Sequence, residues 1–91
     1  MEFLIAFAST SSAIKAEQSL VDHQLQVTVV PLPSQIRAGC GICLRVKTDD
    51  VPLALSVLEQ QNIREISLYS RIKEAGTYSY TAHELPYRRG I

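Results

Sequence analysis

Hydrophobic and polar positions change their period several times along the chain, and each change marks an expected element. Residues 3–8 are apolar throughout, which predicts a central strand covered on both faces or nearly so. A run of hydroxyl residues from Ser9 to Ser12 follows directly and offers helix caps. We therefore expect a helix over about residues 10–23. Its expected buried stripe consists of Ala13, Ile14, Ala16, Leu20 and Val21.

The rest of the chain alternates between the strand period and the helix period. A period of two predicts strands, and Pro31 is expected to end one of them because proline donates no ladder hydrogen bond. A period near 3.6 predicts one further helix, capped at its start by an aspartate. The expected elements are strands near residues 25–29, 42–47 and 65–69, and a helix that starts at Asp49 or Asp50 and ends at Asn62.

The resulting order, βαββαβ, predicts an α+β fold of the ferredoxin-like kind, a two-layer sandwich. Its four-stranded sheet is expected to be antiparallel or mixed, with both helices on one face. We assign residues 1–70 to this domain and residues 71–91 to a C-terminal extension. Alternation at residues 77–81 predicts either an edge strand or a contact with a second subunit, so a homodimer through the sheet edge or the extension stays open. Residues 84–91 are expected to form a loose tail.

Right-handed crossovers fix which segments of such a sheet become neighbours. They place the strand near residues 42–47 between the strands near residues 3–8 and 25–29. The end of the first strand then lies beside the link between the second and third. We therefore expect the turn at residues 9–12 next to the Gly39-Cys40-Gly41 segment.

Composition limits the classes of partner and the cellular compartment that we expect for this protein. Nine Lys/Arg residues balance nine Asp/Glu residues in a chain of 91, which argues against nucleic acid as an obligate partner. The longest apolar run, residues 3–8, is far shorter than the ~20 residues that span a bilayer. No positively charged leader precedes it, so we expect neither a membrane anchor nor a signal peptide. We expect a cytoplasmic protein whose two cysteines stay reduced.

Any chemistry is expected at Cys40, which lies between two glycines that would leave its thiol exposed. The start of the first helix and the guanidinium of Arg37 would both stabilise an anion on the sulfur. Carbonyl groups of a helical turn at residues 34–38 would oppose them. We predict that Cys40 is a carrier thiol. The supporting residues are Gly39, Gly41, Arg37, Ser9, Thr10 and Ser11.

Cys43 forms a Cys-x-x-C spacing with Cys40 and is either a second thiol or a buried strand residue. Redox motifs of this spacing usually lie at the start of a helix, whereas a strand is expected here. Residues i and i+3 of a strand point to opposite faces of the sheet. A zinc site would need two more ligands, for which His23 and His83 are the only histidines. We therefore expect no metal and no cofactor.

Several features of the sequence resemble those of a known family. The chain is similar to the small bacterial domains known as selenium/sulfur carrier-like proteins over about residues 3–70. The resemblance implies a cytoplasmic, non-enzymatic carrier in which Cys40 holds a persulfide or selenopersulfide. Cys43 need not belong to the pattern, and residues 71–91 lie outside it. The similar features are the apolar strand, the Ser/Thr-rich turn, the helix with Ala13, Ala16-Glu17 and Leu20, the Pro31-x-Pro33 segment, and Cys40-Gly41 before a strand.

Two classes of function are consistent with these features. In the first, Cys40 accepts sulfur or selenium from a donor protein and passes it to an acceptor protein. In the second, the chain is a small ligand-binding or protein-interaction module that regulates a partner and performs no thiol chemistry. Its contacts would then come from the open sheet face or a sheet edge. Tyr78, Tyr80 and Tyr87 would form an interaction surface or cover a sheet edge.

Overall fold

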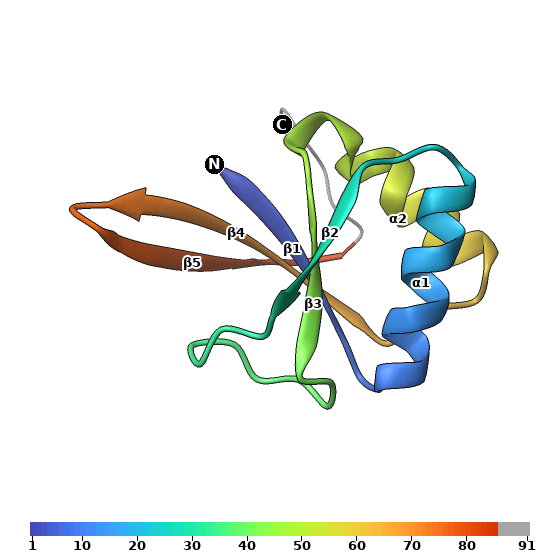
Figure 1. The fold of residues 1–91 in the computed structure, drawn as a ribbon, viewed down its shortest axis with the longest axis horizontal. Helices are drawn as coiled ribbons and strands as arrows, with labels where there is room; N and C mark the ends of the chain where they lie inside the picture. Colours follow the sequence, from blue (N-terminus) through green and yellow to red (C-terminus); the bar gives the residue numbers. More distant parts are fainter. Residues whose placement is uncertain (86–91) are drawn as a thin grey trace.

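The computed structural model describes residues 1–85, which form a five-stranded antiparallel sheet and two α-helices (Figure 1). The strands lie in the order β2-β3-β1-β4-β5. The expected order of the first four strands is confirmed, and the expected count of four is corrected to five. The elements are β1 (Glu2–Phe7), α1 (Thr10–Asp22), β2 (Val27–Pro31), β3 (Ile42–Val46), the 3-10 turn η1 (Thr48–Asp50), α2 (Val51–Gln60), β4 (Ile66–Glu74) and β5 (Thr77–His83).

Helix α1 starts where the hydroxyl run predicts it. Ser9 is the N-cap, and its side-chain oxygen accepts a hydrogen bond from the amide of Ser12 at 3.2 Å. The buried stripe is narrower than expected, because Ile14 and Val21 are 59% and 51% exposed. Small side chains bring the helix close to the sheet along a single line, so neighbouring positions stay in solvent. The buried residues of the helix are Ala13, Ala16 and Leu20.

Helix α2 is preceded by a 3-10 turn that the sequence pattern does not predict. Asp50 occupies the N-cap position but makes no side-chain cap hydrogen bond, so the expected capping role is wrong for this residue. Pro52 lies in the first turn of the helix, where its missing amide costs nothing. Asn62 follows the helix with a φ of 59°, which confirms it as a left-handed terminator.

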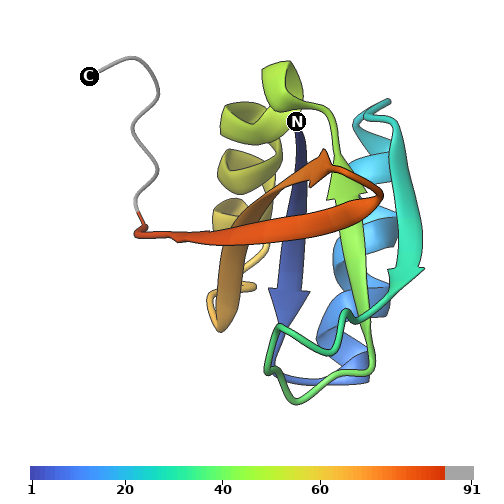
Figure 2. The same cartoon turned by 90° about the vertical axis from the view of Figure 1, so that its left-hand side faces the viewer.

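Both helices cover the same face of the sheet (Figure 2). The main core lies between this face and the helices, and it includes Phe3, Ile5 and Phe7 from β1. A second, smaller cluster lies on the opposite face and includes Leu4 and Ala6. Strand β1 is therefore buried on both faces, as its continuous apolar run predicts.

The β4–β5 hairpin shows that part of the C-terminal extension forms an edge strand, one of the two expected alternatives. β5 pairs with β4 in antiparallel register and forms one edge of the sheet. The connecting residues Ala75 and Gly76 have φ values of 51° and 84°, as a two-residue type I′ turn requires. β4 runs from residue 66 to residue 74 without a break at residue 70. Of the expected loose tail, residues 86–91 lie outside the described part of the chain.

The described residues contain no α-helix that is both long enough and apolar enough to cross a bilayer. Helix α1, with 13 residues, is the longer of the two α-helices in this part of the chain. It is shorter than the ~20 residues that the hydrocarbon core requires.

Candidate functional site

The predicted carrier thiol lies at the end of the loop that joins β2 to β3, residues 32–41. The loop closes on itself through a hydrogen bond from the amide of Leu32 to the carbonyl of Gly41 at 2.9 Å. A single turn at its centre is held by the amide of Ile36 and the carbonyl of Pro33 at 3.0 Å. The expected helical turn over residues 34–38 does not form, and this single turn between residues 33 and 36 takes its place. Within residues 32–41, no helix end therefore directs its carbonyl groups toward Cys40.

Cys40 is buried, with 1% of its surface exposed, so the expectation of an exposed thiol is wrong. Its side chain belongs to the main core between the sheet and the helices. Its amide donates a hydrogen bond to the carbonyl of Phe7 at 3.2 Å, which ties this end of the loop to the end of β1. A cysteine side chain is small and weakly polar, so the core accepts it at no large cost.

The two glycines beside Cys40 have different structural roles. A Cβ atom on Gly39 would lie 1.9 Å from the carbonyl oxygen of Ala8, so the backbones approach too closely for any other residue. A Cβ atom on Gly41 would meet nothing within 4 Å. Gly39 therefore permits the contact that brings Cys40 to β1, whereas no steric requirement explains Gly41.

The predicted neighbourhood of the loop and the start of α1 is confirmed. Gly39 contacts Ala8, and Ala8 immediately precedes the N-cap residue Ser9. The hydroxyl groups there bond to one another: the Ser9 Oγ atom lies 3.0 Å from the Ser12 Oγ atom and 3.3 Å from the Ser11 Oγ atom. Thr10 and Ser11 are exposed at the first turn of the helix. These hydroxyl groups stabilise the helix start beside the loop.

Arg37 lies at the outer side of the loop and is exposed. It lines a shallow depression of about 340 Å³ together with Ala8, Gly39 and Glu65. This depression is on the surface, whereas Cys40 is in the core. The structure thus places the Arg37 side chain at the rim of the loop and not among the buried side chains around the sulfur.

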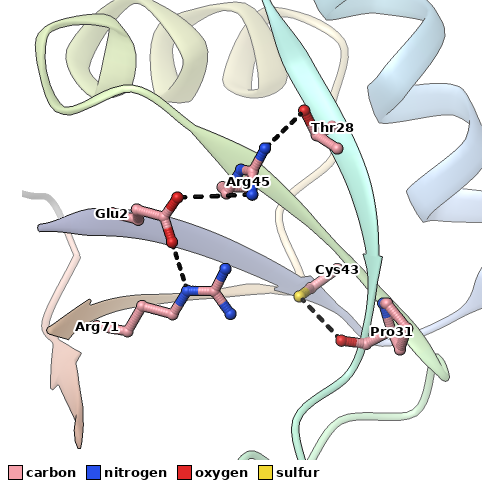
Figure 3. A network of polar contacts seen from close by, with 6 residues as sticks. All are labelled: Glu2, Thr28, Pro31, Cys43, Arg45 and Arg71. Carbon is pink, nitrogen blue, oxygen red and sulfur yellow. Dashed lines mark hydrogen bonds and ion pairs between the residues drawn. The ribbon is translucent and has the colours of Figure 1, made fainter. Parts of the chain in front are cut away.

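Cys43 lies in β3 and is fully buried in the second cluster, on the face opposite to that of Cys40. Its sulfur lies 4.0 Å from the carbonyl oxygen of Pro31 (Figure 3). Burial raises the pKa of the Cys43 thiol to about 11; nearby Arg71 lowers it and Cys40 raises it further. Cys43 is therefore protonated at neutral pH and is a poor nucleophile in this conformation.

The Cys-x-x-C spacing does not bring the two thiols together. Both cysteines are free, and their side chains belong to different clusters, as strand alternation predicts. In the described part of the chain no three His, Cys, Asp or Glu side chains gather as metal ligands would. His23 is the C-cap of α1, with its Nδ1 atom 2.8 Å from the carbonyl oxygen of Ser19.

Two polar groupings could not be found from the sequence because their members lie far apart in the chain. Glu2 bridges Arg71 at 2.7 Å and Arg45 at 3.5 Å across three neighbouring strands (Figure 3). On the helix side, the Nε2 atom of His83 lies 2.7 Å from the hydroxyl of buried Ser70. These contacts follow from strand register, which the periodicity of each strand leaves open.

Comparison of the chain with models of protein families finds a match. The sequence model of a family described as "Putative Se/S carrier protein-like" matches residues 2–70, which include the whole β2–β3 loop and both cysteines. The match ends within β4, so β5 lies outside it. No curated protein and no solved structure matches the chain significantly. Since the match covers well over half of its residues, the chain belongs to the Se/S carrier protein-like family.

Proposed function

We propose that this protein carries sulfur or selenium as a persulfide or selenopersulfide on Cys40. The observation that carries the proposal is the place of Cys40 at the end of a loop within the family-matched segment. Cys43 is less suited, because it is fixed in a paired strand and the pKa of its thiol is raised to about 11. We further propose that the first four strands and two helices are a ferredoxin-like unit extended by β5, and that the protein works in the reducing cytoplasm.

The transfer needs no cofactor and no external oxidant. The Cys40 thiolate attacks the terminal sulfur of a donor persulfide, R–S–SH. A bond forms between the Cys40 Sγ atom and that sulfur, the donor S–S bond breaks, and the donor thiolate leaves with the electron pair. Delivery repeats the step, with a thiolate of an acceptor protein as the nucleophile and Cys40 as the leaving group. A selenium atom in the terminal position is transferred by the same exchange of bonds.

Because Cys40 is buried, transfer requires the β2–β3 loop to open. Few contacts hold the loop: Cys40 and Ile36 are its two buried side chains, and one amide hydrogen bond joins Cys40 to Phe7. Exposing these two side chains and breaking this bond and the Leu32–Gly41 bond costs roughly 3–6 kcal/mol, so the open form would be about 0.6% to 0.004% of the population. The closed loop would shelter a bound persulfide from other thiols.

Intact-mass measurement after incubation with glutathione persulfide tests the proposal. We expect a mass increase of one sulfur atom on the folded protein, removed by dithiothreitol and absent in Cys40→Ser. Cys43→Ser is the matched control and should still take up the sulfur. Uptake that persists in Cys40→Ser, or no uptake by the folded wild-type chain, would contradict the proposal.

The burial of Cys40 also favours a second candidate, a protein-interaction module without thiol chemistry. The face of the sheet opposite the helices would then make the contacts. An absence of sulfur uptake together with partner binding on that face would identify this function. The two candidates therefore differ in one measurement, the mass of the folded protein after exposure to the persulfide.

A further inference from the structure

The sheet face opposite the helices carries a group of basic and aromatic side chains that the proposed sulfur chemistry does not use. On that side the β4–β5 hairpin and the β2–β3 loop both project from the sheet (Figure 1). Alternation and register place the side chains of the group on this one face, which we call the open face. Its basic and aromatic residues are Arg45, Tyr69, Arg71, Lys73, Tyr78 and Tyr80.

The charge of the open face differs from that of the whole chain. The strands place three cations there, Arg45, Arg71 and Lys73, and Glu2 as the single carboxylate. Both guanidinium groups share that carboxylate, at 3.5 Å from Arg45 and 2.7 Å from Arg71 (Figure 3). The chain as a whole has a formal net charge of zero. The open face therefore carries an excess of positive charge that a negative partner would balance.

Tyr78 packs against two of these cations, Arg71 and Lys73. The guanidinium of Arg71 lies 4.3 Å from the centre of the Tyr78 ring, and the ammonium of Lys73 lies 5.8 Å from it. The rings of Tyr78 and Tyr80 are 6.2 Å apart, and Tyr78 is 38% exposed. Tyrosine and arginine are the residue types that most often dominate binding energy at protein interfaces. The group is thus both charged and ordered before a partner arrives.

We propose that the open face docks an acidic segment of the protein that exchanges sulfur with Cys40. Charge complementarity selects the occupant: carboxylates would bind exposed Lys73 and the guanidinium of Arg45, whose side chain is 38% exposed. The Arg71 side chain is only 11% exposed and adds positive charge beneath the surface. A nucleic acid fits less well, because two of the three cations already pair with Glu2 and phosphate backbones need more free positive charge. The identity of the partner as a sulfur donor or acceptor rests on the proposed function; the docking surface does not.

The open face also contacts the loop that ends at Cys40. Tyr69 and Tyr80 pack against the second cluster, which contains Ile36 of the loop and Cys43. Ile36 is 3% exposed and is the only buried side chain of the loop on this face. A segment bound across the tyrosines therefore lies against the residue that holds the loop closed. Docking and exposure of Cys40 would be coupled through Ile36.

The docking proposal is tested by NMR titration of the uniformly 15N-labelled full chain with a capped peptide of eight glutamates. We expect saturable shifts of amide signals concentrated in β3, β4, β5 and the β2–β3 loop, and weaker binding at higher salt. Lys73→Glu should weaken binding about three- to tenfold, because a charge reversal removes one exposed ion pair and adds a repulsion. Tyr78→Ala should also weaken it. Lys15→Glu, an equal reversal on the outer side of α1, should change it less than twofold.

Four results would overturn the docking proposal. They are the absence of saturable shifts, shifts centred outside the open face, equal losses from Lys73→Glu and Lys15→Glu, and tighter binding of an eight-residue oligouridine than of the peptide. The Cys40→Ser variant separates this proposal from the carrier function, since it should still bind the peptide. A chain that binds the peptide but takes up no sulfur would refute the carrier function alone.

Discussion

At the scale of single residues, Gly39 and Gly41 show that two residues of the same type can be under different steric constraints. Both flank Cys40, and the sequence suggests the same role for each, which is to leave the thiol uncovered. The structure gives Gly39 a contact with the Ala8 carbonyl that excludes a side chain, and it leaves open space beside Gly41. The glycine that matters sterically is therefore the one that helps to bury the cysteine.

Gly39→Ala is expected to lower the free energy of unfolding by about 1–3 kcal/mol, because the new Cβ forces the loop away from Ala8. Gly41→Ala is the matched control and should change it by less than about 0.5 kcal/mol, since its Cβ meets no atom. Urea unfolding followed by circular dichroism measures both. Equal destabilisation by the two variants would contradict this assignment.

Cys43 is expected to make stability depend on alkaline pH. Burial raises the pKa of its thiol from 9.0 to about 11, with a smaller lowering effect from Arg71 and a raising effect from Cys40. Between these values the unfolded chain loses a proton that the folded chain keeps, so the free energy of unfolding falls by about 2 kcal/mol as the pH rises from 9 to 11. The stabilisation is fully present below pH 9.

The difference between wild type and Cys43→Ala isolates the contribution of this thiol from that of every other titratable group. Urea unfolding at several pH values should show a steeper decline for the wild type. Parallel declines for the two proteins would show that Cys43 does not cause the pH dependence.

At the scale of elements, local patterns predict the two α-helices and the first four strands, but they do not predict every buried position. The hydroxyl run before α1 and the left-handed residue after α2 act within one turn of chain, and both predictions are confirmed. Burial of Ile14 and Val21 was predicted wrongly, because it depends on how closely α1 approaches the sheet. The sequence pattern does not decide the β4–β5 hairpin, because strand pairing needs a partner strand and a turn together.

The hairpin turn offers a stabilising substitution. Ala75 has a φ of 51°, a left-handed conformation that alanine adopts at a cost and asparagine at a smaller one. Ala75→Asn should raise the free energy of unfolding by about 0.5–1 kcal/mol. Ala38→Asn is the control, at an exposed loop position outside the positive-φ group. Thermal unfolding compares the two, and a gain in both or in neither would count against the turn assignment.

At the scale of the whole molecule, the β2–β3 loop is held on both faces of the sheet at once. Cys40 enters the core on the helix side, and Ile36 enters the cluster on the open face. Residues between them are exposed, including Arg37 and Gly39. This double attachment explains why a loop with two glycines nevertheless buries its thiol, and it makes Ile36 the contact whose loss would release Cys40.

Ile36→Ala is expected to speed alkylation of Cys40 by iodoacetamide in the native protein by about ten- to a hundredfold, because it weakens the closed loop. Val57→Ala, on the buried face of α2, is the control for general loss of stability and should speed alkylation much less. Intact-mass kinetics at pH 8 measures both. Equal acceleration by the two variants would show that Cys40 is reached by global unfolding and not by loop opening.

The sequence by itself determined the order of the first four strands and the two α-helices, the central position of β1, the neighbourhood of the Cys40 loop and the start of α1, and the resemblance to the family. These follow from hydrophobic period, short-range capping and the handedness of crossovers, which act locally or hold for all such folds. Only the tertiary structure decided that Cys40 is buried and that Glu2, Arg45 and Arg71 meet. Burial and cross-strand contacts depend on register and on the depth of packing between segments far apart in the chain, which no local pattern encodes.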